Sequence, residues 1–492
     1  MPTPTPAPET SLALLTDFYQ LTMAYAYWKS GTHPKEAVFN LFFRNQPFRG
    51  GFTIASGVSA VIDYVRQFRF SASDLEYLGG LTGRDGQPMF EPAFLDVLAT
   101  VRFEGDLDAI PEGTVVFPHE PLVQVRGSIL QAQLLESVLL NIVNFQSLIA
   151  TKAARICLAA RQHPVIEFGL RRAQGIDGAL TASRAAYVGG CAGTSNVLAG
   201  KLYGIPVLGT HAHSWVMSFA SELESFQTYA EALPNNCVFL VDTYNTLDGI
   251  RHAAIVGQWL REHGHELVGV RLDSGDLAWL SMEGRKILDD AGLRNAVIIA
   301  SNDLDEHLIT SLNEQGARID VWGVGTKLAT AYDQPALGGV YKLAAIRTDG
   351  GPWEYKLKLS EQSIKVSNPG IQQVRRFRSD REFVGDAIYD RELGAPAEFT
   401  IVDPLDATRR KHIPATTPYE DLLVPVFRGG ELVYDQPPLA AIRQRTGEQL
   451  SMLHPGIKRF ANPHQYPVGL EATLNDVKTR LVLAARGEAS TM

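Results

Sequence analysis

The amino-acid sequence predicts an α/β fold: a parallel, TIM-like α/β barrel between an N-terminal α+β segment and a C-terminal non-barrel segment. Between residues 165 and 322, six short apolar runs that start about 23 to 40 residues apart alternate with helical patterns, as in βαβ units. Runs broken by glycine and proline fill residues 96–127, and the alternation ends near residue 345. These changes divide the chain into residues 1–130, 131–345 and 346–492.

Composition and charge narrow the class of protein. The chain has 492 residues, enough for about three domains, and 45 Lys and Arg against 54 Asp and Glu give a net charge of −9. This balance argues against a surface that binds nucleic acid, but is compatible with a local basic pocket for an anion. Three cysteines cannot all pair, so we expect a reducing, cytoplasmic location.

No segment has the pattern of a signal peptide or of a membrane-spanning helix. Residues 1–8, MPTPTPAP, lack a basic region and an apolar region, and we expect a short extended tail there. The most apolar long stretch, Leu134–Ala150, contains Glu136 and three amides, so it is too short and too polar to span a bilayer. We therefore expect neither a membrane nor a nucleic acid as a partner.

The expected N-terminal elements begin with a helix over residues 12–28, whose apolar side chains recur at alternating spacings of four and three. They are Leu14, Phe18, Leu21, Tyr25 and Trp28. An extended run at 37–43 and strand-like runs at 114–117 and 122–126 follow. A long amphipathic helix over about 135–155 then leads into the barrel.

The six apolar runs are expected to be the barrel strands. They lie at 165–169, 205–209, 237–241, 267–272, 296–300 and 319–322. Helical patterns occupy most of the gaps, at 213–233, 247–263, 276–291 and 303–316. Because successive parallel strands need right-handed crossovers, this many units favour a barrel over a short open sheet.

The active site of a parallel α/β barrel lies at the carboxyl ends of its strands. Each predicted strand is followed there by charged or aromatic side chains, hydroxyls or glycines. These residues are Phe168, Gly169, Arg171, Arg172, Thr210, His211, His213, Asp242, Thr243, Asn245, Arg271, Asp273, Ser274, Gly275, Asp276, Ser301, Asn302, Asp303, Gly323, Gly325, Thr326 and Lys327. Because a purely structural barrel would scatter such residues, the pattern predicts a catalytic barrel.

Two of these groups suit the binding of anions, although each also has a structural interpretation. Gly323, Gly325 and Thr326 can present backbone N–H groups to a phosphate or form an ordinary turn, and the Walker A spacing is absent. Arg171 and Arg271 can hold a carboxylate or phosphate in a two-bond fork, or form ordinary salt bridges.

The aspartates and histidines at the strand ends have several interpretations. Asp273 and Asp276 can bind Mg²⁺ or sugar hydroxyls, or cap the next helix. The pair His211 and His213 can begin the metal site of a barrel hydrolase, but the other strand ends supply no further histidine. One histidine can instead act as acid, base or phosphoryl acceptor, and a packed polar pair is the third alternative.

Taken together, the motifs resemble the nicotinate phosphoribosyltransferase family, and they occur in order along nearly the whole chain. The motifs are Thr16–Met23 (TDFYQLTM), Glu167–Gly175 (EFGLRRAQG), Gly193–Gly200 (GTSNVLAG), Gly209–Trp215 (GTHAHSW), Val270–Asp276 (VRLDSGD), Val321–Thr326 (VWGVGT), Lys358–Ser360, Asn368–Gly370 and Asn462–Pro467. No single motif is specific for this family, but the order in which all of them occur is.

The resemblance implies an irregular α/β barrel beside a domain built from both termini, and a homodimer with sites at its interface. The implied reaction converts nicotinate and 5-phosphoribosyl 1-diphosphate to nicotinate mononucleotide and diphosphate, as an entry to NAD salvage. It is coupled, as in a ligase, to hydrolysis of ATP with Mg²⁺. The coupling passes through a phosphorylated histidine, which the motif places at His213 rather than His211.

The resemblance also assigns roles to single residues. Catalytic roles fall to His213, to Asp273 as a Mg²⁺ ligand, and to Arg171 beside the leaving diphosphate. Phe168 is expected to stack on the pyridine ring, with Tyr19 of a neighbouring subunit on its other face. The remaining substrate-binding positions are Ser195, Thr210, Arg271 and Asp242, with Gly323, Gly325 and Thr326 around the ribose phosphate.

Several alternatives stay open at this point. Nicotinamide phosphoribosyltransferases carry Asp where this chain has Ser195, and an aspartate would repel the carboxylate of nicotinate, so nicotinate is favoured. Quinolinate phosphoribosyltransferase is shorter and needs no phosphorylated histidine. A metal-dependent hydrolase and a non-catalytic ligand sensor are the alternatives from other classes. Ile371 stands where the family often has a lysine, which leaves the ATP contacts open.

Overall fold

A computed structural model of the protein describes residues 11–348 and 350–487. The tail expected at residues 1–8 lies outside this range. The chain divides into two compact units: one combines the residues up to Leu148 with those from Ala336 onward, and the other is Ile149–Pro335. The sequence predicted boundaries after residues 130 and 345; the second of these falls inside a strand, β12 (Gly339–Arg347).

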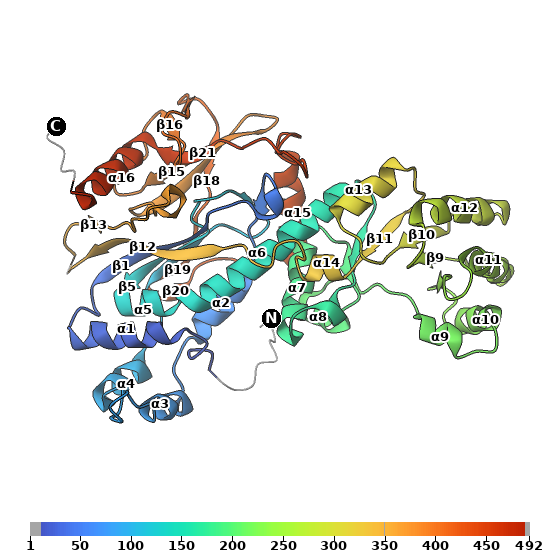
Figure 1. Cartoon of the computed structure of the whole chain (residues 1–492), viewed down its shortest axis with the longest axis horizontal. Helices are drawn as coiled ribbons and strands as arrows, with labels where there is room; N and C mark the ends of the chain where they lie inside the picture. Colours follow the sequence, from blue (N-terminus) through green and yellow to red (C-terminus); the bar gives the residue numbers. More distant parts are fainter. Residues whose placement is uncertain (1–10, 349, 488–492) are drawn as a thin grey trace. The chain divides into compact units, whose positions relative to one another are not determined.

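The unit Ile149–Pro335 is built on a six-stranded parallel sheet, in the order β7-β6-β11-β10-β9-β8 (Figure 1). Its strands are β6 (Val165–Glu167), β7 (Gly193–Thr194), β8 (Val238–Leu240), β9 (Gly269–Leu272), β10 (Val297–Ala300) and β11 (Val321–Val324). Five of the six predicted runs therefore form strands of this sheet, and all neighbouring pairs are parallel.

The predicted strand at 205–209 is the exception. Pro206 has no N–H to donate, and only one isolated parallel bridge, between Val207 and Thr194, continues the sheet beyond β7. Among the described residues, no backbone ladder joins this segment to β8. The N–H of Leu240 in β8 donates instead to Nε2 of His211, over 3.2 Å. The parallel α/β arrangement is confirmed, whereas a ring of strands closed by hydrogen bonds is not seen.

Helices fill the crossovers between these strands. They are α7 (Ile176–Val188), α8 (Val197–Tyr203), α9 (His213–Met217), α10 (Glu222–Ala232), α11 (Thr246–Glu262), α12 (Leu277–Asp290), α13 (Glu306–Glu314) and α14 (Thr326–Ala329), with the 3-10 turn η2 (Leu170–Arg172). In Figure 1, α10, α11 and α12 lie in a row beside β9 and β10. The helix predicted over 213–233 is two helices, because Ser221 caps a second one by accepting from the N–H of Glu224.

The other unit contains two large sheets, and one of them joins the two ends of the chain. A seven-stranded sheet has the order β13-β12-β1-β5-β3-β19-β20. Its strands are β1 (Glu36–Phe43), β3 (Asp106–Ala109), β5 (Val123–Ser128), β12, β13 (Glu354–Tyr355), β19 (Val424–Arg428) and β20 (Glu431–Leu432). β1 pairs with β12, and β3 pairs with β19, both antiparallel, so N-terminal and C-terminal segments share this sheet.

The second sheet of this unit is C-terminal and has six strands in the order β17-β16-β21-β15-β14-β18. They are β14 (Gln372–Arg378), β15 (Phe383–Asp390), β16 (Phe399–Val402), β17 (Arg410–Ile413), β18 (Tyr419–Asp421) and β21 (Val468–Glu471), while β2 (Thr53–Ile54) pairs with β4 (Val115–Val116). The helices are α1 (Phe18–Lys29), α2 (Val58–Gln67), α3 (Ala72–Gly79), α4 (Pro92–Thr100), α5 (Ile129–Leu134), α15 (Leu439–Ser451) and α16 (Ala472–Ala485). The long helix α6 (Glu136–Ala159) runs through the boundary between the units.

The predicted N-terminal elements are largely present. The run at 37–43 is the buried strand β1, and the first helix begins at Phe18, six residues later than expected.

Ile371, at the position of the family lysine, is 4% exposed and packs with Val38 and Ala345 in the core. None of the described helices combines the length and apolar character needed to cross a bilayer.

Candidate active site

Arg271, the third residue of β9, is the centre of a cluster at the carboxyl ends of the parallel strands. Its Nε donates to Ser301 Oγ over 2.8 Å, one terminal nitrogen donates to Thr210 Oγ1 over 3.0 Å, and the other donates to Asp273 Oδ1 over 2.7 Å. These bonds use three of the five guanidinium N–H groups. The guanidinium is therefore held in one orientation, with donors left for an anion.

The aromatic ring of Phe168 lies beside this guanidinium. The Cζ atom of Arg271 is 5.5 Å from the centre of the ring, within cation–π range. Phe168 follows β6, and its N–H donates to the carbonyl of Val324 in β11 over 2.8 Å. A Cβ atom at Gly323 would lie 2.6 Å from the ring, so only glycine leaves room for Phe168 at this place.

His213 and Asp242 form a second part of the cluster. Nε2 of His213 lies 4.0 Å from Oδ1 of Asp242, and Nδ1 of His213 lies 3.1 Å from the hydroxyl of Thr243. The side chain of His213 is 40% exposed, whereas that of Asp242 is 1% exposed. Oδ2 of Asp242 accepts from the N–H of Asp273 and from Ser274 Oγ, and its buried Oδ1 has no hydrogen-bond partner among the described residues.

His211 has a different environment from His213. It is 7% exposed, and its Nε2 accepts the N–H of Leu240, so the ring proton must lie on Nδ1, which is 3.4 Å from the carbonyl of Ala212. Burial lowers the pKa of His211 to about 4. His211 is therefore neutral and structural near pH 7, and it does not share a ligand set with His213.

The remaining predicted residues of this unit lie on the same edge of the sheet. Ser195 directly follows β7 and is half-buried, and its N–H donates to the carbonyl of Glu167 over 2.9 Å. Gly325 lies before the one-turn helix α14, which begins at Thr326. Arg171 lies in η2, is exposed, and forms no side-chain hydrogen bond or ion pair with the residues that the structure describes. The side chain of Asp276 accepts the N–H of Trp279 and so caps α12, which agrees with the structural interpretation of this residue.

Asp273 was expected to bind Mg²⁺. Its Oδ1 accepts hydrogen bonds from both Arg271 and Ser301, which leaves Oδ2 for a metal ion. Within the described part of the chain, no three His, Cys, Asp or Glu side chains are grouped as a metal site. Mg²⁺ commonly uses only one or two carboxylates and takes its other ligands from substrate phosphates and water. The remaining oxygen of Asp273, Oδ2, fits that mode of binding.

Tyr19 belongs to the other unit and lies in the first turn of α1. Its side chain is 47% exposed, next to Phe18 at 50%. The Tyr19 side chain therefore does not belong to the hydrophobic core of this unit. Partial burial and the charge of Glu136 raise the pKa of its hydroxyl.

The same unit holds a cluster of basic side chains that sequence reasoning missed, four of them cations and one the neutral His119. It consists of Arg44 after β1, His119, Lys342 in β12, Lys358, and Lys478 in α16, and is called the cation cluster below. Burial is the largest cause of the lowered pKa values of His119 and Lys342. Lys478 and Arg44 lower the pKa of His119 further, and Arg44 and Lys358 lower that of Lys342, whereas Asp403 and Glu136 act in the opposite direction. The basic groups are therefore close neighbours. Nε of Arg44 and Nε2 of His119 are buried without hydrogen-bond partners among the described residues.

Burial is the main cause of the unusual pKa values in the cation cluster. It lowers the pKa of Lys478 to about 8 and that of His119 to about 4. Nζ of Lys478 donates to the neutral side chain of Asn368 over 2.9 Å. Unpaired buried donors and crowded cations are costly unless an anion binds, so the cluster suits a polyphosphate. Its members come from distant segments, so no sequence spacing could reveal it.

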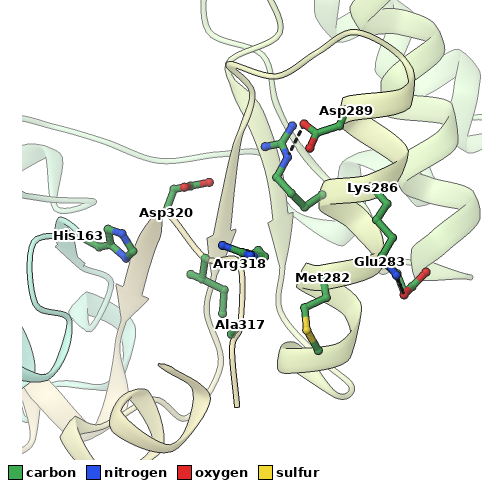
Figure 2. A pocket seen from close by; sticks show the side chains of 10 residues that line it. His163, Met282, Glu283, Lys286, Asp289, Ala317, Arg318 and Asp320 are labelled. Atoms are coloured by element: carbon green, nitrogen blue, oxygen red, sulfur yellow. Dashed lines mark hydrogen bonds and ion pairs between the residues drawn. The ribbon is translucent and has the colours of Figure 1, made fainter. Parts of the chain in front are cut away.

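A separate cavity of about 850 Å³ lies near the amino ends of the parallel strands (Figure 2). Its charged lining is largely self-paired: Arg285 binds Asp289, Lys286 binds Glu283, and Asp320 accepts the N–H of Ile298. Catalytic groups of parallel α/β proteins lie at the opposite, carboxyl ends. We therefore place the active site at the Arg271 cluster and not in this cavity.

Comparison with known proteins identifies the family of the chain. Three family models match the chain in order: the nicotinate phosphoribosyltransferase (NAPRTase) N-terminal domain over residues 14–144, the NAPRTase family over 164–365, and the NAPRTase C-terminal domain over 371–478. The chain is 44% identical over 487 residues to nicotinate phosphoribosyltransferase of Bacillus subtilis (strain 168), covering 96% of this chain and 97% of the relative.

Human relatives are similar in both sequence and structure. The chain is 36% identical to nicotinate phosphoribosyltransferase of Homo sapiens, covering 94% of this chain and 95% of the relative. The crystal structure of human nicotinic acid phosphoribosyltransferase superposes with a TM-score of 0.82 at 34% identity, covering 95% of this chain and 99% of that one. From these full-length similarities and the geometry of the Arg271 cluster, the chain belongs to the nicotinate phosphoribosyltransferase family.

Proposed function

We propose that the protein transfers the phosphoribosyl group of 5-phosphoribosyl 1-diphosphate to nicotinate, forming nicotinate mononucleotide and diphosphate for NAD salvage. The observation that carries this proposal is the fixed guanidinium of Arg271 beside the ring of Phe168. Nicotinate is a flat aromatic ring with a carboxylate. A ring face and a cationic fork side by side are the two groups that recognise such a molecule.

The transfer forms a bond between the pyridine nitrogen and the anomeric carbon of the ribose while the bond from that carbon to the diphosphate oxygen breaks. Positive charge develops on the ribose and negative charge on the diphosphate. Arg171, exposed and unpaired within the described chain, is the group that we assign to the leaving diphosphate. Gly323, Gly325 and Thr326 present backbone donors to the ribose phosphate.

We assign the coupling to ATP to His213. A ring nitrogen of His213 forms a bond to the γ-phosphorus of ATP, the bond to the ADP oxygen breaks, and water later hydrolyses the phosphohistidine. Oδ1 of Asp242, buried and unpaired, faces Nε2 of the ring and stabilises its positive charge. Asp273 would hold Mg²⁺, which would neutralise charge on the bound phosphates.

The cation cluster supplies a second part of this proposal. Arg44, whose buried Nε has no hydrogen-bond partner among the described residues, and Lys478 suit an anion that carries phosphate groups, and the two phosphate-bearing substrates are the anions to test against this cluster. Because residue 371 is an isoleucine that packs in the core, the family lysine at that position has no counterpart, and Lys358 and Lys478 are the cations that we assign in its place.

We further propose a cytoplasmic homodimer with an irregular, TIM-like barrel, in which Tyr19 contributes to the site of the neighbouring subunit. The exposed aromatic side chains Phe18 and Tyr19 on α1 and the three free cysteines support this assignment.

A product assay tests the proposal. Purified protein with Mg²⁺ and 5-phosphoribosyl 1-diphosphate receives nicotinate or nicotinamide, each with and without ATP. We expect nicotinate mononucleotide to form, faster with ATP, and little product from nicotinamide. Product from nicotinamide alone would reassign the specificity, and no product from either base would refute the proposal in favour of a sensor or a hydrolase.

A further inference from the structure

Glu167 is a buried carboxylate at the last position of β6, directly before Phe168. It is 1% exposed. Its Oε2 accepts from Ser183 Oγ in α7 over 2.8 Å and from Thr194 Oγ1 in β7 over 2.6 Å, and its Oε1 accepts the N–H of Gly169. One carboxylate thus connects the turn after Phe168 with α7 and β7.

The same hydrogen bonds enclose Ser195, the residue after Thr194. The N–H of Ser195 donates to the carbonyl of Glu167 over 2.9 Å, and the N–H of Asn196 donates to Thr194 Oγ1 over 3.0 Å. Nδ2 of Asn196 donates to Ser183 Oγ over 3.2 Å, which closes the network. The backbone on both sides of Ser195 is therefore fixed relative to Glu167.

The turn after Phe168 is packed closely against α14 and the residue before it. A Cβ atom at Gly169 would lie 2.3 Å from Cβ of Ala329 and 3.0 Å from the carbonyl oxygen of Gly325. The ring of Phe168 itself rests on Gly323. Any shift of the Glu167 carboxylate must therefore move Phe168 and Gly169 against a packed surface.

We propose that Glu167 is a positioning residue for nicotinate: it touches no substrate, but its carboxylate sets the separation between the Phe168 ring and Ser195. This inference rests on the proposed function, because Phe168 and Ser195 are the residues assigned to the ring and to selection by its carboxylate. A buried network in which every donor has an acceptor favours a single arrangement, so removing one donor loosens the pocket.

Single-donor variants give the sharpest test. Thr194→Val keeps the side-chain shape and removes one hydroxyl, and Ser183→Ala removes the other. The matched control is Ser281→Ala, another buried helix hydroxyl of this unit, which binds Ala278 and Arg318 in the backbone. We expect Thr194→Val to raise KM for nicotinate about tenfold, because an imperfectly placed binding residue loses affinity rather than chemistry.

Comparing the effect of each variant on KM with its effect on kcat separates a positioning role from a purely structural one. We expect kcat at saturating nicotinate and KM for 5-phosphoribosyl 1-diphosphate to stay within about twofold of wild type. Glu167→Gln, which can still accept from Gly169 and donate to a hydroxyl, should restore more nicotinate affinity than Glu167→Ala. If Glu167→Ala does not fold, Thr194→Val and Ser183→Ala still decide the question.

Wild-type protein measured in parallel distinguishes the two possible failures. Active wild type with unchanged nicotinate KM in both single-donor variants would overturn the positioning role, even if both variants melt at lower temperature. Wild type that forms no nicotinate nucleotide would overturn the proposed function, and with it this inference. A raised nicotinate KM in both variants, but not in Ser281→Ala, supports it.

Discussion

His213 Nε2 and Asp242 Oδ1 face each other across 4.0 Å, and the aspartate oxygen is buried without another partner. The second oxygen of Asp242 is fixed by the N–H of Asp273 and the hydroxyl of Ser274. A carboxylate held in this way stabilises a positively charged imidazole, such as the protonated or phosphorylated ring. No such carboxylate of the described residues faces the neighbouring His211, so the two histidines of the motif differ in chemistry as well as burial.

The first prediction concerns this pair. His213→Ala should abolish stimulation by ATP and leave slow, ATP-independent formation of nicotinate mononucleotide, because the phosphoryl acceptor is lost while the Arg271 cluster is intact. The measurement is product formation with and without ATP, together with ADP release. His265→Ala, which removes an exposed histidine bonded to Asn235, is the control. Full ATP stimulation in His213→Ala would show that the phosphoryl acceptor is elsewhere.

The second prediction concerns the choice of base at Ser195. Ser195→Asp should raise KM for nicotinate by about tenfold or more, because like charges in an enclosed site cost several kcal/mol. Ser195→Asn has a similar size without charge and is the matched control. Initial rates with nicotinate and with nicotinamide measure the effect. An unchanged nicotinate KM in Ser195→Asp would place the substrate carboxylate away from this residue.

The third prediction tests the close approach of Gly323 to the ring of Phe168. In Gly323→Ala the new methyl group would lie 2.6 Å from the ring, so the ring must move. We expect KM for nicotinate to rise about tenfold, since stacking and the adjacent Arg271 fork are both displaced. Gly209→Ala adds the same methyl group where nothing lies within 4 Å, and it should leave KM unchanged. Equal KM values for both variants would argue against stacking on Phe168.

Much of the parallel sheet follows from local sequence, because its strands are short and buried. The run predicted at 296–300 forms β10 at Val297–Ala300, and the run at 237–241 forms β8 at Val238–Leu240. The apolar pattern of a segment does not show whether its backbone N–H groups are available for a sheet. In the segment 205–209, where the sheet would have to continue, Pro206 has no backbone N–H to donate. The N–H of Leu240 in β8 is bonded by the side chain of His211 and not by another strand.

The sequence predicts those residues of the candidate site that lie at the carboxyl ends of strands. Arg271, Asp273 and Thr210 were singled out by position after apolar runs, and the structure brings them into contact. Ser301 was noted only as part of a strand end, although it binds both Arg271 and Asp273. Glu167 opens a family motif but receives no role from the sequence, because a carboxylate inside a strand gives no periodic signal and its hydrogen-bond partners come from two other elements.

The fourth prediction follows from the lowered pKa of His211, about 4 against an ordinary value of 6.5. Between these pH values the unfolded chain binds a proton at this residue that the folded chain does not. Stability is therefore lost as pH falls from 6.5 toward 4, by at most about 1.4 kcal/mol per pH unit for this group. His119, with its pKa also lowered to about 4, contributes in the same direction.

Urea unfolding at several pH values measures the contribution of His211. His211→Asn retains an acceptor for the N–H of Leu240 but does not titrate, so its midpoint should depend less on pH between 6.5 and 4 than that of wild type. His263→Asn, at an exposed histidine of the same unit, should retain the wild-type dependence. Identical pH profiles for wild type and His211→Asn would contradict the buried, neutral state of His211.

The fifth prediction concerns Lys478 of the cation cluster, whose pKa burial lowers to about 8. A bound polyphosphate favours the charged amine, so 5-phosphoribosyl 1-diphosphate should bind best below pH 8. Its KM should rise as pH passes through 8 and the free enzyme loses this proton. For folding the sign is opposite: the unfolded chain holds the proton up to about pH 10.5, so this residue favours the folded state increasingly between pH 8 and 10.5.

Two substitutions at Lys478 separate charge from packing. Lys478→Met keeps the apolar stem, and should raise KM for 5-phosphoribosyl 1-diphosphate at pH 7 by about tenfold and remove the rise above pH 8. Lys478→Arg stays charged at higher pH, so its KM should remain low beyond pH 8. Initial rates from pH 7 to 9.5 at constant ionic strength measure both effects. The same profile in all three proteins would show that this cation does not meet the phosphates, and would leave Arg44 and Lys342 as the anion-binding members of the cluster.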